Sequence, residues 1–346
     1  MKKAILLIFL LTVLFSSTNA QQQQIIALQV GEEVTFFNNL DSAIIAAPQG
    51  AEIYLPPGIF QHNTNLLIDK RLNIYGVGHY LVSTYTMMRT VIAGDIKYVT
   101  GSDSSVIAGV YCDNISFGTS AADDALSNIL IQRCNANNIN LGLSTNPPVS
   151  SSIFIQECVV RGSLNGYNAE NCVISKSIFN NTVYSFSYLS VSNSVFLGNY
   201  YIYYNQYYCP IYSVNSSLIQ NNIFKYSGNQ AIHTSVTNSA FLNNLFVQNL
   251  TNFSGNSNVN NIVSVSTSLI FVNQSGTTFS YDHNYHLVDD SPGKNAGNDG
   301  TDIGIYGTDE PYKELGIPFT PRIMEFKLRP QGNTIQLNTS VEAQER

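Results

Sequence analysis

Three charged residues stand at one recurring position of this sequence and are its first candidates for chemistry. Arg133, Glu157 and Lys176 each come directly before a residue that recurs from one sequence unit to the next. If the units stack, their charges lie side by side in the order plus, minus, plus. Such a group could act in acid-base catalysis, or it could be a ladder of exposed ion pairs that keeps neighbouring units in register. Because exposed ion pairs are common and contribute only about 0–1 kcal/mol each, we favour the structural ladder.

The recurring position belongs to an internal repeat. The stretch "ILIQRCNA" at 129–136 returns as "IFIQECVV" at 153–160, and shorter versions follow. The repeated positions are separated by steps of 24, 19, 17, 28 and 22 residues; they are Cys134, Cys158, Ser177, Ser194, Asn222 and Asn244. A period of this size indicates a solenoid, in which each unit buries its apolar side only against its neighbours.

Apolar residues flank each repeated position at fixed distances. Two positions later stand Ala136 and Val160, and then phenylalanine four times, at 179, 196, 224 and 246. Three positions earlier stand Ile131, Ile155, Ile174, Val191, Ile219 and Phe241. Each unit therefore reads as a short strand, a polar turn and a second strand. We expect a buried phenylalanine column and, at the turn, a column of small or polar groups in which Asn tolerates left-handed backbone and bonds its counterpart in the next coil.

These columns resemble the right-handed parallel β-helix of the pectin-lyase-like superfamily. The stretch "LDSAIIAAPQGAEIYLPPGIF" (40–60) is similar to that family's opening, a short amphipathic helix that caps the first coil. The stretch "YHLVDDSPGKNAGNDGTDIGIYG" (285–307) resembles the closing segment of many secreted bacterial members, in which a final strand ends in "DIGxYG". The resemblance implies an all-β fold but no single activity, because the superfamily contains lyases, hydrolases, adhesins and other proteins.

Enzymes of this superfamily need carboxylates that this repeat lacks. The resemblance implies calcium-binding carboxylates on adjacent coils for a lyase, or an aspartate cluster for a hydrolase. Between residues 126 and 281 the only acidic residues are Glu157 and Glu170. The pairs Asp123–Asp124 and Asp289–Asp290 could each bind a cation, and "GNDGTDIG" (297–304) resembles a calcium-binding glycine/aspartate turn, but we favour structural turns for all three. We therefore expect no catalytic group, metal site or cofactor, and keep a divergent polysaccharide lyase or glycoside hydrolase as the alternative.

Tyrosines concentrate in the longest repeat step. The segment 184–212 contains nine of them, and we select Tyr201, Tyr203, Tyr204 and Tyr207 as candidate ligand-binding residues. A tyrosine offers an apolar ring and a hydroxyl, which suit a sugar or a partner protein. The alternative is that these side chains only cover an outer strand surface. The leading expectation is a non-catalytic extracellular or cell-surface module that binds a glycan or a protein.

Composition limits the possible partners and the location. The chain has a net charge of −7 and only 11% charged residues, which argues against a nucleic-acid partner. Lys2 and Lys3 precede the apolar run "AILLIFLLTVLF", which is typical of a secretory signal peptide cut after Ala20 and is too short for a transmembrane helix. We expect an exported protein without a transmembrane segment, with five cysteines present as buried free thiols.

The expected organisation has four parts. A signal peptide spans residues 1–20, an N-terminal segment with the capping helix 21–49, the β-helix 50–307, and a linker with a C-terminal β-hairpin 308–346. The hairpin contains the alternating runs 323–328 and 334–341 around "PQGN". We expect it to cover the C-terminal end of the stack, because an uncovered coil is an open sheet edge. Docking of a partner is the second possibility.

Overall fold

The computed structural model describes most of the chain after residue 24. The described ranges are 25–62, 66–80, 89–119, 125–143, 149–198, 201–203, 206–225, 232–249, 253–318, 322–331 and 334–342. For 201–203, 206–208, 315, 322–331 and 334–342 it describes the backbone alone. The expected signal peptide, Asp123, Asp124 and Tyr204 lie outside the described residues.

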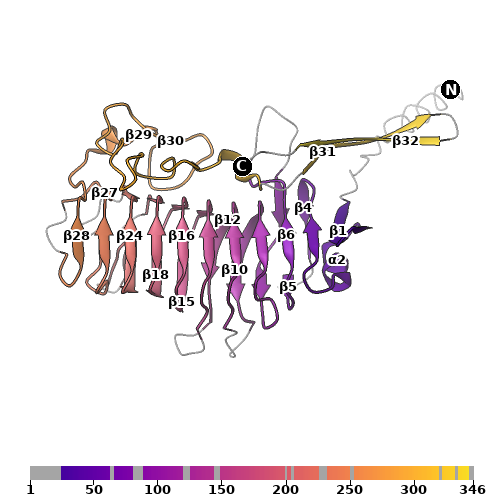
Figure 1. Ribbon diagram of the computed structural model, residues 1–346, viewed down its shortest axis with the longest axis horizontal. Coiled ribbons are helices and arrows are strands. Elements are labelled where there is room, and N and C mark those ends of the chain that lie inside the picture. Colours follow the sequence, from indigo (N-terminus) through magenta and orange to yellow (C-terminus); the bar gives the residue numbers. More distant parts are fainter. Residues whose placement is uncertain are drawn as a thin grey trace, which may run out of the picture.

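The protein is a parallel β-helix built from two long sheets (Figure 1). The first sheet contains ten parallel strands: β3 (Glu52–Tyr54), β6 (Asn73–Tyr75), β9 (Val106–Ala108), β11 (Leu130–Gln132), β13 (Phe154–Gln156), β16 (Val173–Ser175), β19 (Ser190–Ser192), β24 (Leu218–Gln220), β26 (Ala240–Leu242) and β28 (Ser257–Val259). The second sheet contains β4 (Gly58–Phe60), β5 (Leu66–Ile68), β7 (Thr90–Ile92), β8 (Ile96–Tyr98), β10 (Tyr111–Phe117), β12 (Asn135–Asn140), β14 (Val159–Val160), β15 (Leu164–Glu170), β17 (Ile178–Phe179), β18 (Val183–Ser187), β20 (Val195–Phe196), β23 (Ile211–Asn215), β25 (Ile223–Phe224) and β27 (Leu245–Phe246).

Strand pairing confirms the register of the repeat. Ile131 pairs with Ile155, and the column continues through Ile174, Val191, Ile219 and Phe241. The phenylalanines form the second expected column, with successive ring centroids 5.1, 4.7 and 4.5 Å apart; the rings belong to Phe179, Phe196, Phe224 and Phe246. All are buried, so each coil completes the core of the next.

The turn column forms a hydrogen-bonded ladder. In successive coils, the side-chain oxygen of Ser194 accepts from Ser177 N, that of Asn222 from Ser194 N, and that of Asn244 from Asn222 N. The sequence predicted left-handed backbone at these residues themselves. In the structure the residue directly before each of them has the left-handed backbone instead. That preceding column has φ angles between +48° and +56° and contains Arg133, Glu157, Lys176, Asn193, Asn221 and Asn243. The direction of each side chain in this column is therefore set by the left-handed turn, because these residues lie between strands.

The N-terminal end is covered as expected. The antiparallel strands β1 (Ile26–Val30) and β2 (Glu33–Phe37) extend the first sheet beyond β3. Helix α2 (Leu40–Ala46) follows, and the Asn39 side chain accepts a hydrogen bond from Ser42 N at its start. The helix buries Leu40, Ala43 and Ile44, so it caps the first coil.

The coil that begins with β28 is the last: Asn261 extends the turn ladder, Ile262 bridges to Leu245, and Val265 N donates to Phe246 O. Beyond it the chain runs back along the outside of the second sheet (Figure 1). This return segment contains η1 (Thr267–Leu269), β29 (Phe271–Asn273), β30 (Asn284–Leu287) and η2 (Glu314–Gly316). The expected final strand at "DIGIYG" is absent from this described stretch, and Ile303 and Ile305 are buried against the outside of the coils instead. The β-helix thus has a second apolar core. It joins residues of the sheet (Val159, Ile178, Val195, Ile223, Leu245) to residues of the return segment (Ile270, Phe271, Leu287, Ile303, Ile305, Tyr312).

The C-terminal hairpin does not cover the C-terminal end of the stack. Pro318 lies against Gly109, which has φ +70° and where an added Cβ would meet the proline ring at 2.5 Å. The chain has by then returned to the early coils. From there β31 (Arg322–Gln331) and β32 (Thr334–Glu342) extend beyond the N-terminal end of the β-helix (Figure 1). The expectation of an end cap beside β28 is wrong, because the return segment first carries the chain back along the molecule.

Candidate functional site

The left-handed turn column fastens the last part of the return segment, residues 293–318, which we call the strap. Turn residues of successive coils contact successive positions of the strap, and the strap runs in the opposite direction to the order of the coils. Asn243 Nδ2 donates to Ala296 O at 3.0 Å, Asn221 Nδ2 to Asn298 Oδ1 at 2.7 Å, and Asn193 Nδ2 to Gly304 O at 3.4 Å. The strap is therefore held by one turn side chain after another.

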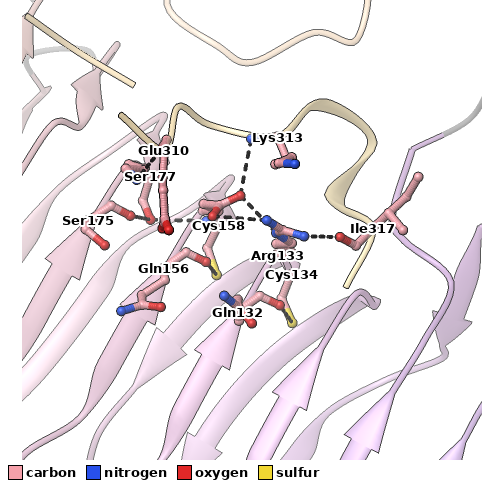
Figure 2. Close-up of polar contacts among 12 residues, drawn as sticks. Gln132, Arg133, Cys134, Gln156, Cys158, Ser175, Ser177, Glu310, Lys313 and Ile317 are labelled. Atoms are coloured by element: carbon pink, nitrogen blue, oxygen red, sulfur yellow. Dashed lines mark hydrogen bonds and ion pairs between the residues drawn. The ribbon is translucent and has the colours of Figure 1, made fainter. Parts of the chain in front are cut away.

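The charged residues Arg133, Glu157 and Lys176 continue this series. Lys176 Nζ donates to Glu310 O, Glu157 Oε2 accepts from Lys313 N at 3.2 Å, and Arg133 Nη1 donates to Ile317 O (Figure 2). All three strap partners are backbone groups. The contacts fix the path of the strap without requiring a particular strap side chain.

Arg133 and Glu157 form a buried ion pair. Arg133 Nε lies 2.9 Å from Glu157 Oε2, and Arg133 Nη2 lies 3.2 Å from Glu157 Oε1. The Arg133 side chain is 0% exposed, so the pair is under the strap and not in an exposed ladder. Two parallel hydrogen bonds and backbone partners satisfy both groups. Each side-chain nitrogen of Arg133 and each carboxylate oxygen of Glu157 has a partner within the chain, which favours a structural role for the pair.

Other acidic residues that the structure describes take part in turns and surface pairs. Among the residues that the structure describes, no group of three or more histidine, cysteine, aspartate or glutamate side chains could hold a metal ion. Asp299 Oδ1 accepts from Thr301 N and Oγ1, and Asp302 Oδ1 accepts from Asn295 N. Asp289 pairs with Lys294 at 3.2 Å on the surface. These carboxylates stabilise turns. The five cysteines are buried and unpaired with one another.

Of the selected tyrosines, Tyr201, Tyr203 and Tyr207 lie on two short antiparallel strands between β20 and β23, and Tyr204 lies outside the described residues. The two strands are β21 (Tyr201–Tyr203) and β22 (Gln206–Tyr208), with Tyr201 opposite Tyr208 and Ile202 opposite Tyr207. The structure describes the backbone of Tyr201, Tyr203 and Tyr207 and not their side chains. Strand β22 leads directly into β23, where the described tyrosines resume.

Two described tyrosines form a stack on the outer face of the second sheet. Tyr184 on β18 pairs with Tyr212 on β23, and their ring centroids are 4.5 Å apart at an angle of 11°. Both side chains are partly exposed. His233 contacts the far side of Tyr212 edge-on, at 6.3 Å. The stack therefore runs along the axis of the β-helix.

On its other side the aromatic column changes to amides. Tyr184 pairs with Asn165, which pairs with Asn140, which pairs with Ser116. Small side chains thus replace rings at this position in the coils before Tyr184. We call Asn140, Asn165, Tyr184 and Tyr212 the tyrosine step. Tyr167 stands beside it, over Gly142, where a Cβ would lie 3.0 Å from the tyrosine side chain.

The step offers an aromatic face beside neutral hydrogen-bonding groups. A ring face binds the apolar side of a sugar, and amides bind its hydroxyls. The sequence indicated a tyrosine-rich region here but not the step, because the step depends on the pairing of β15 with β18. The sequence signal for the step is the alternation of inward and outward residues in "VYSF" (183–186) and "LNGY" (164–167). Aligning these two stretches places Tyr184 next to Asn165 on the outer face.

No known protein family and no curated protein matches this chain in sequence. In the part of the chain that the structure describes, no helix is long and apolar enough to cross a membrane.

Proposed function

We propose that the protein is an exported, non-catalytic binding module for a neutral glycan, and that it is a divergent member of the pectin-lyase-like superfamily. A parallel β-helix with a capping helix supports the second part, together with the buried turn ladder. The leader-like segment at residues 1–20 supports export.

The tyrosine step is the observation that carries the binding proposal. It combines the partly exposed Tyr184 ring with the partly exposed Asn140 on a rigid sheet, on either side of the buried Asn165. The surrounding chain has few charges, so stacking and neutral hydrogen bonds are the available sources of affinity. The segment 201–207, with Tyr201, Tyr203, Tyr204 and Tyr207, adjoins the step in the sequence and would extend the binding surface. A cell-surface protein is the alternative ligand class.

A glycan array followed by titration calorimetry tests this proposal. We expect at least one neutral oligosaccharide to bind, and Tyr184→Ala and Asn140→Ala to weaken binding about tenfold or more, since stacking contributes about 1–3 kcal/mol in comparable aromatic contacts. Tyr188→Ala is the matched control, because Tyr188 is a tyrosine with 57% exposure at a turn outside the step. Unchanged binding in both step variants would place the site elsewhere.

An activity assay on the same glycans separates a binder from a divergent enzyme. Incubation with wild type should release neither unsaturated products, which absorb in the ultraviolet, nor new reducing ends. Release of either product that disappears on mutation of the step would establish a lyase or a hydrolase instead.

A further inference from the structure

Two arginines converge on one tyrosine at the edge of the return segment. The Arg89 guanidinium carbon lies 3.7 Å from the centroid of the Tyr111 ring, and that of Arg161 lies 4.4 Å from the same centroid. Because both distances are measured to the same ring centroid, the separation of the two guanidinium carbons is at most the sum of the two distances. All three side chains are partly exposed, so the group is open to solvent.

These arginines have no acidic partner within the described residues. The ion pairs there join Lys70 to Asp69, Arg133 to Glu157 and Lys294 to Asp289. Asp95, on the coil before Tyr111, accepts from Asn114 instead. Two cations held on one ring repel each other, and an anion between or beside them would remove that cost.

Two buried polar atoms in this group also lack a partner. Arg161 Nη2 donates to Cys112 O at 2.7 Å, but its Nε makes no hydrogen bond and is buried. Asn135 occupies the coil position next to Tyr111, and its buried Oδ1 is likewise without a partner. Buried polar groups are normally satisfied, so such orphans indicate a ligand or ordered water.

The return segment holds the group in place. Tyr281 Oη donates to His79 O at 2.9 Å and accepts from Asn135 Nδ2 at 2.8 Å. Burial raises the pKa of Tyr281 to about 12, and the nearby Arg89 guanidinium opposes that rise. Tyr281 therefore orients the Asn135 amide and lies beside Arg89.

We propose that Arg89, Arg161 and Asn135 form an oxyanion-binding site built around Tyr111. Its ligand is a carboxylate, sulfate or phosphate group, bound by the two guanidinium forks, with a hydroxyl of the same ligand donating to Asn135 Oδ1. The site is on a different part of the second sheet from the tyrosine step, since Tyr111 lies at the start of β10 whereas Tyr184 lies on β18. It does not depend on the proposed neutral-glycan function.

Titration calorimetry of the full chain with sodium sulfate, sodium phosphate and sodium glucuronate tests the site. Sodium chloride at matched ionic strength provides the baseline. We expect saturable binding of at least one oxyanion, with at least a tenfold loss of affinity in Arg89→Gln and in Arg161→Gln. The preferred salt identifies the chemical class, because the three anions carry sulfate, phosphate and carboxylate groups.

Arg71→Gln is the matched control, since Arg71 is an exposed arginine beside Gly50 in an early coil. Arg161→Lys keeps the charge and replaces the glutamine variant if loss of the Cys112 contact prevents folding; it should also bind more weakly, because it lacks the fork. Absence of saturable binding to all three oxyanions, or equal binding in the wild-type and Arg89→Gln proteins, would overturn the proposal.

Discussion

Glu157 lies directly beside Arg133 on the next coil, with 2.9 Å between Arg133 Nε and Glu157 Oε2, and both have left-handed backbone. A long side chain with left-handed backbone costs about 1–2 kcal/mol, and later coils place Asn at the same position. The hydrogen bonds of Arg133 to Ile317 O and of Glu157 to Lys313 N offset this backbone cost, because they hold the strap on the coils. The sequence pattern of plus, minus and plus thus reflects how the strap is attached.

Glu157→Gln should strongly destabilise the protein. The substitution leaves the Arg133 guanidinium buried without its counter-charge, and breaking one side of a buried pair costs about 3–5 kcal/mol. The free energy of unfolding from urea denaturation measures the loss. Lys294→Gln is the control, because it breaks an exposed pair and should cost at most about 1 kcal/mol. Equal effects of the two substitutions would mean that the strap does not bury Arg133 in solution.

Asn222→Ala should cost more than Asn222→Ser. Asn222 accepts from Ser194 N and donates to Val191 O, so alanine leaves two buried backbone groups unsatisfied at about 1–3 kcal/mol each. Serine can keep the first bond, since Ser194 itself accepts from Ser177 N in the preceding coil. Thermal melts of both variants test this order. A serine variant as unstable as the alanine variant would show that the turn ladder depends on the amide.

The sequence was sufficient to predict the stacking register because neighbouring coils constrain one another. Phe196 must stack on Phe224 and Ile155 on Ile174, so the spacing of these residues records the pairing directly. The capping helix could also be predicted, since Asn39 and the buried face of 40–46 are local features. Local and nearest-coil contacts leave a pattern in the sequence.

The strap could not be predicted, because its contacts join distant residues and mostly involve backbone. Asn243 binds the carbonyl of Ala296, and Lys176 binds that of Glu310. A backbone carbonyl requires no particular side chain, so these contacts have no sequence signature. The position of the C-terminal hairpin was mispredicted for the same reason. The oxyanion group likewise depends on Tyr281 meeting Asn135 from far along the chain.

Ending the chain after Pro318 should leave the β-helix intact. The described contacts of the strap end at Pro318, and β31 pairs with β32, far from β28. We expect the free energy of unfolding to change by less than about 1 kcal/mol, because stability varies locally and, among the described strands, β31 and β32 pair only with each other. Ending the chain after Asn295 is the comparison: it uncovers Ile178, Val195 and Ile223 and should lower the melting temperature strongly. Similar melting of both truncated proteins would contradict the assigned role of the strap.

His79 should make the protein sensitive to mild acid. Burial, followed by the nearby Arg89 charge, lowers the pKa of His79 from 6.5 to about 3. Between these values the unfolded chain binds a proton that the folded chain excludes, so stability falls as the pH decreases from 6.5 toward 3. The slope from this residue is at most about 1.4 kcal/mol per pH unit. Urea denaturation at several pH values should show a shallower decline in His79→Gln than in wild type below pH 6.5, and parallel curves above it. Parallel curves through the acid range as well would show that His79 is not held neutral beneath the strap.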